Sequence, residues 1–71
     1  MMSTLYFKTI DEKVMQRASN ALHDGTEFRA AATPHGLVAG RVVKIEPMPA
    51  RPDGKHEWEI DLRDVRKVEL D

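Results

Sequence analysis

The clearest hydrophobic pattern in this chain is helical and covers residues 10–23. Apolar residues recur there at spacings of three, four and one, as one face of an α-helix requires: Ile10, Val14, Met15, Ala18, Ala21 and Leu22. Thr9 and Glu12 match a capping box, in which the two side chains satisfy free amides at the start of a helix. Gly25 suits the left-handed residue that often ends one. We therefore expect a helix over residues 10–23 whose apolar face is buried on a sheet.

Alternating apolar and polar residues predict strands on both sides of this helix. Residues 4–8 and 26–32 alternate in this way, and the first of these two strands is expected at a sheet edge. Further along the chain HEWEIDL alternates cleanly, the alternation then breaks, and RKVEL resumes it. We expect residues 56–70 to form a strand, a tight turn at 63–65 and a short closing strand.

The middle strand, expected at 37–46, contains a glycine that decides which side chains are buried. A strict period of two would bury Arg41 on the same side as Val43 and Ile45. A bulge or bend at Gly40 interrupts the alternation instead, so the side chains after it can exchange the buried and the exposed face of the strand. We expect this bent form, which buries Val42 and Ile45 and leaves three charged side chains exposed: Arg41, Lys44 and Glu46.

Two connections have the composition of turns and loops. TPHG, residues 33–36, places proline second and glycine fourth, as a type I turn favours. PMPARPDGK, residues 47–55, holds three prolines and an Asp-Gly pair, which predicts a loop or a very irregular hairpin connection.

These elements predict an α+β fold: one N-terminal helix packed on a small, strongly bent antiparallel sheet, or an SH3/Sm-like barrel of four or five strands. The element order, the run GRVVKIE and the segment WEIDLRDVRKVEL resemble the Sm-like proteins over about 45 residues, from Thr26 to Leu70, and the preceding helix. The resemblance implies a small RNA-binding barrel. It rests on apolar spacing alone.

The sequence departs from the Sm-like pattern at the positions that carry function in that family. The family's RNA-contacting residues follow the acid that ends the bent strand and lie in the turn before the last strand. Here PMPAR follows Glu46 and LRDV surrounds Arg63, without the family's asparagine-bearing motif, so no RNA-binding residue is carried over. The additional strand at 4–8 also leaves an open sheet under the helix as the alternative to a barrel.

Length and composition limit the classes of function. The 71 residues suffice for a single domain, 1–71, with a small core. Hydrophobic residues make up 41% and charged residues 32%, as in folded domains, and the formal net charge of −1 lacks the broad positive field of many nucleic-acid binders. The absence of cysteine excludes disulfides, thiolate metal sites and cysteine nucleophiles. No leader or membrane-spanning pattern is present, so we expect a cytoplasmic protein that does not enter membranes.

The sequence offers no convincing catalytic or metal-binding motif. His23, His35 and His56 lack the short spacings that bring two histidines to one metal ion. No serine has the context of a nucleophile, and no glycine-rich phosphate loop precedes the helix. We expect no enzyme activity, no cofactor and no metal.

Two charged surfaces are candidate binding sites. One face of a strand carries an acidic row, Glu57, Glu59 and Asp61, which a basic partner could contact. Cross-strand pairing of this row with Arg29, Arg41 or Lys44 is an equally good explanation. A basic rim could contact phosphates, although Trp58 is expected in the core and not as a stacking platform. The rim consists of Arg41, Lys44, Arg63, Arg66 and Lys67.

The sequence thus favours a small regulatory module that binds a larger protein through a sheet face or edge. An RNA- or DNA-binding barrel is the alternative. Self-association through sheet edges stays open.

Overall fold

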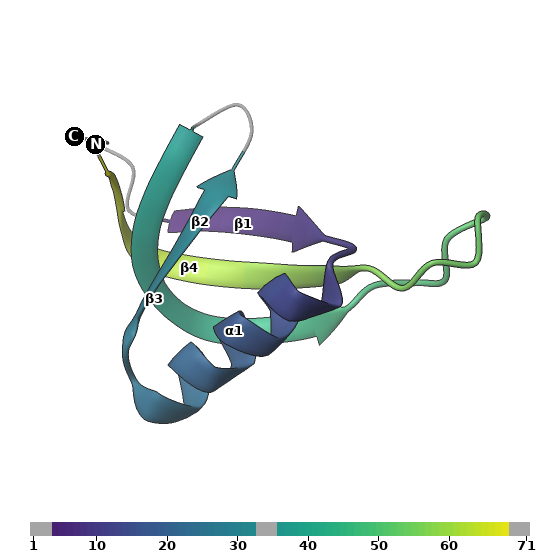
Figure 1. Cartoon of the computed structure of the whole chain (residues 1–71), viewed down its shortest axis with the longest axis horizontal. Helices are drawn as coiled ribbons and strands as arrows, with labels where there is room; N and C mark the ends of the chain where they lie inside the picture. The colour runs from purple at the N-terminus through teal and green to yellow at the C-terminus, as the bar shows by residue number, and fades with distance from the viewer. Residues whose placement is uncertain (1–3, 33–35, 69–71) are drawn as a thin grey trace.

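The computed structural model describes residues 4–32 and 36–68 of the chain. Figure 1 shows one helix, α1 (Glu12–Asp24), and four strands: β1 (Thr4–Thr9), β2 (Glu27–Ala32), β3 (Gly36–Pro47) and β4 (Trp58–Lys67). The strands form one antiparallel sheet in the order β1-β4-β3-β2, and α1 packs mainly on β3 and β2. β1 and β2 end this order and do not pair with each other within the described residues, so the sheet is bent but not closed into a barrel.

The helix begins and ends through caps that its own sequence supplies. The N-cap is Asp11, whose carboxylate accepts a hydrogen bond from the amide of Lys13 at 2.9 Å. The predicted capping box of Thr9 and Glu12 is therefore wrong. The Thr9 hydroxyl accepts a hydrogen bond from the amide of Asp11 and not from the amide of Glu12, the next residue. Gly25 ends the helix at φ 70°, as predicted, and its amide donates to the carbonyl of Ala21.

The bend in β3 confirms the reading of Gly40. The register between β3 and β4 shifts twice, between Ala39 and Arg41 and between Val42 and Lys44. Around these shifts Val42 is buried and Arg41 is exposed, as expected for the bent strand. A Cβ on Gly40 would lie 3.0 Å from the Arg63 carbonyl oxygen and 3.2 Å from Val65 Cγ2, so only glycine allows β4 to approach this closely.

The end of β4 differs from the prediction. The expected turn at 63–65 and separate closing strand are absent from the described residues, since β4 runs unbroken from Trp58 to Lys67. Asp64 adopts φ 55°, and together with Val65 it lies opposite the single residue Gly40. This β-bulge absorbs the break in alternation without a turn, and Val65 is buried. Of the turn predicted at 33–36, residues 33–35 lie outside the described residues and Gly36 begins β3. The end of the predicted closing strand also lies outside the described residues.

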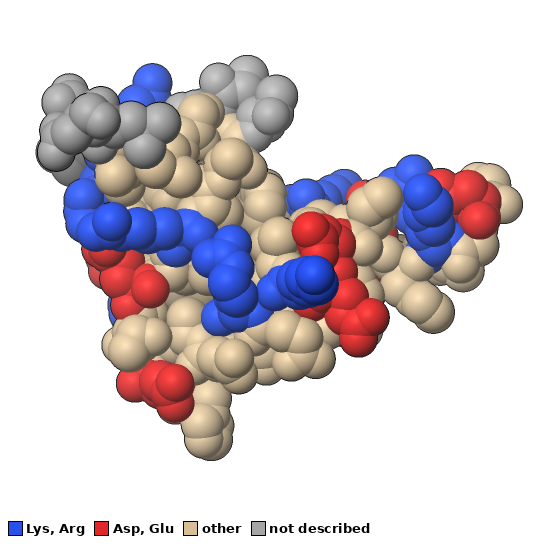
Figure 2. Space-filling model, viewed as in Figure 1, with Lys and Arg blue, Asp and Glu red and all other residues tan. Residues whose placement is uncertain are grey.

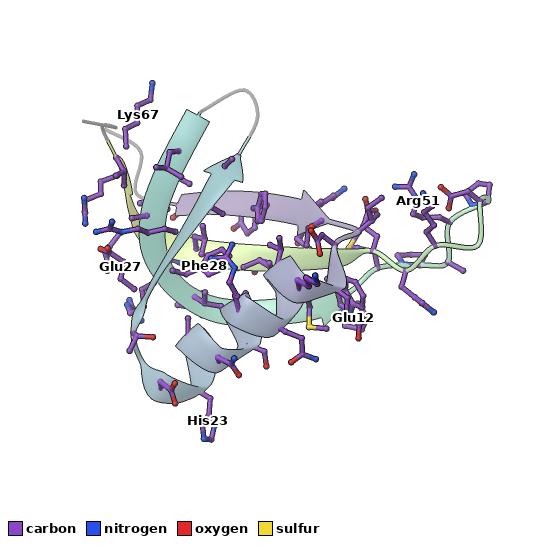
Figure 3. The ribbon with its side chains drawn as sticks, in the orientation of Figure 1. Glu12, His23, Glu27, Phe28, Arg51 and Lys67 are labelled. Atoms are coloured by element: carbon purple, nitrogen blue, oxygen red, sulfur yellow. The ribbon has the colours of Figure 1, made fainter. Side chains whose placement is uncertain are left out.

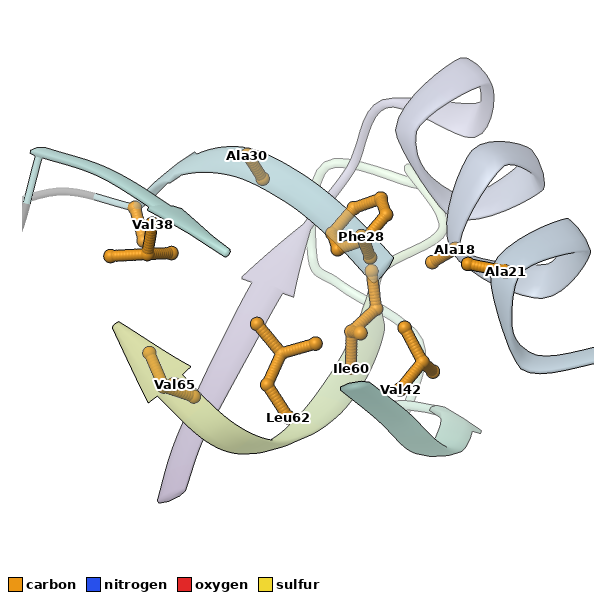
Figure 4. Close-up of a cluster of buried hydrophobic side chains, with 10 residues drawn as sticks. Ala18, Ala21, Phe28, Ala30, Val38, Val42, Ile60, Leu62 and Val65 are labelled. Atoms are coloured by element: carbon orange, nitrogen blue, oxygen red, sulfur yellow. The ribbon is translucent and has the colours of Figure 1, made fainter. Parts of the chain in front are cut away.

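The core lies between α1 and the sheet (Figure 4). Its buried side chains come from the helix and from three of the strands: Ala18, Ala21, Phe28, Ala30, Ala32, Val38, Val42, Ile60, Leu62 and Val65. β1 contributes only the partly buried Leu5 and Phe7, which pack against the margin of this cluster. Trp58 is half-buried and lies outside it, so the expectation of a core tryptophan is wrong. The core is therefore fully covered on the β2 side and only partly covered on the β1 side.

Candidate functional site

The predicted acidic row has both basic and acidic cross-strand neighbours. Glu59 and Asp61 are half-buried on β4, on the face opposite the buried Ile60. The register places Glu59 between Lys8 of β1 and Glu46 of β3, and Asp61 opposite Lys44 of β3. Oδ1 of Asp61 is buried and has no hydrogen-bond partner within the described residues. This oxygen is thus out of reach of a partner, and the two acids do not form an isolated acidic surface.

The third acid of the row, Glu57, belongs to a different part of the molecule. It precedes β4, and its carboxylate accepts a hydrogen bond from Nη1 of Arg51 at 3.2 Å. Arg51 also donates to the carboxylate of Asp53, with Nε–Oδ1 at 3.1 Å. This pair lowers the pKa of Asp53 and raises the pKa of Arg51, in each case chiefly through their mutual hydrogen bond. Arg51 therefore ties Glu57 into the connection between β3 and β4.

The predicted basic rim is spread over β3 and β4, and several of its members pair with acids. Arg41 and Arg63 are direct cross-strand partners, and Nη2 of Arg41 lies 3.5 Å from Oδ2 of Asp64. Lys44 Nζ lies 3.5 Å from Oε2 of Glu46. Figure 2 shows a band of basic side chains crossing this face of the molecule, with acidic side chains beside its ends.

The remaining rim residues lie toward the end of β4. Arg66 Nη2 contacts Oε2 of Glu27 at 2.8 Å, and Arg29 Nε contacts the other carboxylate oxygen at 3.2 Å. Hydrogen bonds from Arg66, and then from Arg29, lower the pKa of the Glu27 carboxyl. Lys67 is exposed at the end of the strand. Two arginines thus share one acid, which anchors the start of β2.

The histidines do not converge. His23 is exposed at the end of α1, and the ring of His56 lies 6.3 Å from that of Trp58. His35 lies outside the described residues. Within the part of the chain that the structure describes, no group of three or more histidine or acidic side chains could hold a metal ion.

A cavity beside β1 is the feature that sequence reasoning missed. It has a volume of about 660 Å³ and is bounded on one side by β1, with Leu5 and Phe7. Val14 of α1 and the last two residues of β2, Ala31 and Ala32, form other parts of its wall. The outer edge of β1 is unpaired among the described residues. We call this space, between the β1 edge, α1 and the end of β2, the seam.

The edge of β2 is covered in a way that the edge of β1 is not. Nη1 of Arg17, on α1, donates a hydrogen bond to the backbone carbonyl of Arg29 at 3.2 Å. The same guanidinium lies 5.2 Å from the centre of the Phe28 ring, within the range of a cation–π contact. The helix therefore occupies backbone hydrogen-bonding capacity on β2 and leaves β1 open.

Comparisons with protein-family models, with curated proteins and with solved structures find no match. The resemblance to Sm-like proteins accordingly stays a prediction. No helix among the described residues is long and apolar enough to cross a membrane.

Proposed function

We propose that this protein is a non-enzymatic interaction module that accepts an extended segment of a larger protein in the seam. The observation that carries the proposal is the unpaired edge of β1 beside a cavity of about 660 Å³. Ligand sites commonly have volumes of about 300–1,000 Å³. The segment would add a fifth strand to the sheet next to β1.

The backbone of β1 supports strand addition. An edge strand presents a row of unpaired amides and carbonyls, and proteins usually protect such edges with charges, prolines or bulges. β1 is six residues long, pairs with β4 in an unbroken register, and contains no proline and one charged residue, Lys8. Main-chain hydrogen bonds to such an edge provide affinity, while pockets for alternate side chains provide specificity.

The side chains of the seam indicate what kind of segment fits. Leu5, Phe7 and Val14 are only partly buried against the core, so an added strand would cover apolar surface. Ala31, Ala32 and Val14 form the wall opposite β1, so an occupant would lie between these residues and the β1 edge. We infer a single extended strand as the occupant of this space. The occupant is therefore a single extended peptide with apolar residues at alternate positions.

A pair of exposed alanines allows a matched test. Ala31 lines the seam, whereas Ala50 is exposed on the far connection between β3 and β4. Peptides selected from a displayed random library against the wild-type chain are titrated into the ¹⁵N-labelled protein. We expect the selected peptides to carry apolar residues at alternate positions. Their binding should shift the NMR signals of the β1 amides and slow the hydrogen exchange of these amides. Ala31→Arg should weaken binding about tenfold or more, the loss of at least one good contact, while Ala50→Arg should not.

The proposal is wrong if the selected peptides leave β1 unchanged, or if both arginine variants bind as the wild type does. Thermal unfolding of each variant verifies that the fold is intact. The acidic row Glu57, Glu59 and Asp61 stays a predicted second contact surface. Glu59 also lines the seam, so only shifts confined to Glu57 and Asp61 would assign binding to the row.

One observation favours nucleic acid as the alternative partner. Arg63 lies directly opposite Arg41, and like charges in that position destabilise a sheet. Arg41 pairs with Asp64, whereas Arg63 forms no ion pair within the described residues, so a phosphate would give Arg63 a partner. Binding of mixed RNA and single-stranded DNA should then fall steeply with salt, and Arg63→Gln should reduce the slope by about one. Absence of binding at low salt would exclude this alternative.

A further inference from the structure

The connection between β3 and β4 forms an arm that projects from the body of the molecule (Figure 1). Ordinary hairpin loops between neighbouring antiparallel strands contain about two to five residues. Here ten residues, 48–57, separate β3 from β4. The arm is longer than the connection requires, and it shares no residue with the seam.

Prolines stiffen the outgoing half of this arm. Pro47, Pro49 and Pro52 have their φ angles fixed by the ring, and each also restricts the residue before it to extended or polyproline II conformations. Every residue from 46 to 52 except Ala50 is therefore either a proline or a residue that precedes one. The prolines therefore favour extended backbone over most of the segment up to Arg51, and a turn begins at Pro52.

The exposure of the side chains follows the period of a polyproline II helix. Met48 and Arg51 are half-buried, whereas Pro49, Ala50 and Pro52 are exposed. A polyproline II helix has three residues per turn, so residues three apart lie on the same ridge. One ridge, with Met48 and Arg51, is partly buried, and its Arg51 reaches Glu57 in the returning half of the arm. The other, with Pro49 and Pro52, is exposed to solvent.

Hydrogen bonds fix the arm in this arrangement (Figure 3 labels Arg51). Arg51 reaches the returning chain at Glu57 through Nη1, at 3.2 Å, and the amide of Met48 donates to the carbonyl of Glu57 at 2.9 Å. At the tip, the amide of Gly54 donates to the carbonyl of Arg51 at 3.0 Å, which closes a turn. A segment that is already ordered loses less conformational entropy on binding.

We infer that the ridge of Pro49 and Pro52 is a ligand for a partner protein whose groove is lined by aromatic side chains. Domains that recognise polyproline II segments of the form P-x-x-P use such grooves, and Pro49-Ala50-Arg51-Pro52 has this form. The guanidinium of Arg51 is turned toward Glu57 and Asp53. The contact to the partner is therefore apolar, made by the two proline rings and Ala50.

The test uses the full-length ¹⁵N-labelled chain and a panel of purified SH3, WW and EVH1 domains. At least one domain is expected to shift the NMR signals of amides in residues 48–55 and to leave the amide signals of β1 unchanged. Pro49→Ala removes one ring of the ridge and should weaken this binding about tenfold, the equivalent of one lost contact. Lys55→Ala, on the returning half of the arm, is the matched control and should bind as the wild type does.

Arg51→Ala separates the ridge from its support. Both prolines remain, but the bonds to Glu57 and Asp53 are lost, so affinity should fall by roughly threefold through the entropy of ordering the arm. The inference is overturned if no domain of the panel shifts the arm, or if Pro49→Ala binds as tightly as Lys55→Ala. Unchanged sheet shifts in each variant show that the body has kept its fold.

Discussion

The two outer strands of the sheet, β1 and β2, are each six residues long but are protected in different ways. β2 carries the buried Phe28, 2% exposed, and one of its carbonyls receives a hydrogen bond from Arg17 of α1. β1 carries the half-buried Phe7 and the exposed Tyr6. Among the described residues, no side chain outside β1 forms a hydrogen bond with the backbone of β1. The molecule thus protects one edge and leaves the other available.

The difference follows from the short connections on either side of α1. The helix follows β1 after two residues, Ile10 and Asp11, and Gly25 then turns the chain directly into β2. Since β2 pairs with β3, the helix returns along that pair and its buried alanines meet Phe28. β1 lies on the far side of β4, so only the start of the helix approaches it. A single short helix on a four-stranded sheet covers one edge, and the other becomes the seam.

The largest expected difference between the two edge strands is the loss of stability when the phenylalanine of each is replaced by alanine. Phe28→Ala removes a ring from the centre of the core and should cost about 3–5 kcal/mol, as buried Phe-to-Ala changes do. Such a loss is comparable with the whole stability of a small domain. Phe7→Ala removes a half-buried ring and should cost roughly half as much, leaving a folded protein. Urea unfolding followed by circular dichroism measures both, and equal losses would show that β1 is as well integrated as β2.

A smaller effect is expected from uncovering β2. Arg17→Ala removes the donor to the Arg29 carbonyl and the contact with the Phe28 ring, and should cost about 0.5–1.5 kcal/mol. Amides at the β2 edge should exchange faster. Lys13→Ala, at another exposed position of α1, is the matched control, because its side chain forms no ion pair within the described residues. If the β2 amides exchange at the same rate in the two variants, the helix does not protect β2.

Sequence periodicity was sufficient for the features that depend on near neighbours. The helix, the facing of Phe28, Ala30 and Ala32, and the bend at Gly40 all follow from spacing within a few residues, and the structure confirms them. The predicted apolar face of the helix is only partly buried: Ala18 and Ala21 are buried, whereas Leu22 is exposed and Ile10 is exposed before the helix begins. The cap could not be chosen in this way, since Thr9 and Asp11 both suit an N-cap. The bulge at Asp64 was missed because a break in alternation fits a tight turn as well as a bulge, and the turn was chosen.

Features that depend on strand order could not be predicted. The cross-strand partners of the acidic row follow from the register: Lys44 was among the expected partners of these acids, but Lys8 was not. The seam exists because β1 pairs with β4 and not with β2, and no local pattern specifies that choice. The alternation of residues 4–8 did predict an edge strand, which the structure confirms.

The smallest expected effect concerns the acid that anchors β2. Glu27 accepts hydrogen bonds from Arg66 and Arg29, which lower its pKa from the usual 4.5. A carboxyl whose pKa is lower in the folded state contributes stability above the pH at which it titrates in the unfolded chain. That contribution is lost as the pH falls through the lower, folded value. Wild type should therefore lose stability relative to Glu27→Gln on acidification below about pH 4.5, and not between neutral pH and that point.

Titration of the Glu27 carboxyl by ¹³C NMR separates the two arginines. Arg66→Gln should raise the pKa more than Arg29→Gln, because Arg66 makes the larger contribution and the shorter contact, 2.8 Å against 3.2 Å. A titration in the usual glutamate range in wild type would show that the anchor does not form. Once acid has protonated Glu27, the β2 amides should exchange somewhat faster than at neutral pH, because one of the contacts that hold β2 is lost. The β1 amides should change less, because β1 contains no acid. The contrast between the two edges should therefore narrow on acidification without being reversed, because Arg17 and the buried Phe28 still hold β2.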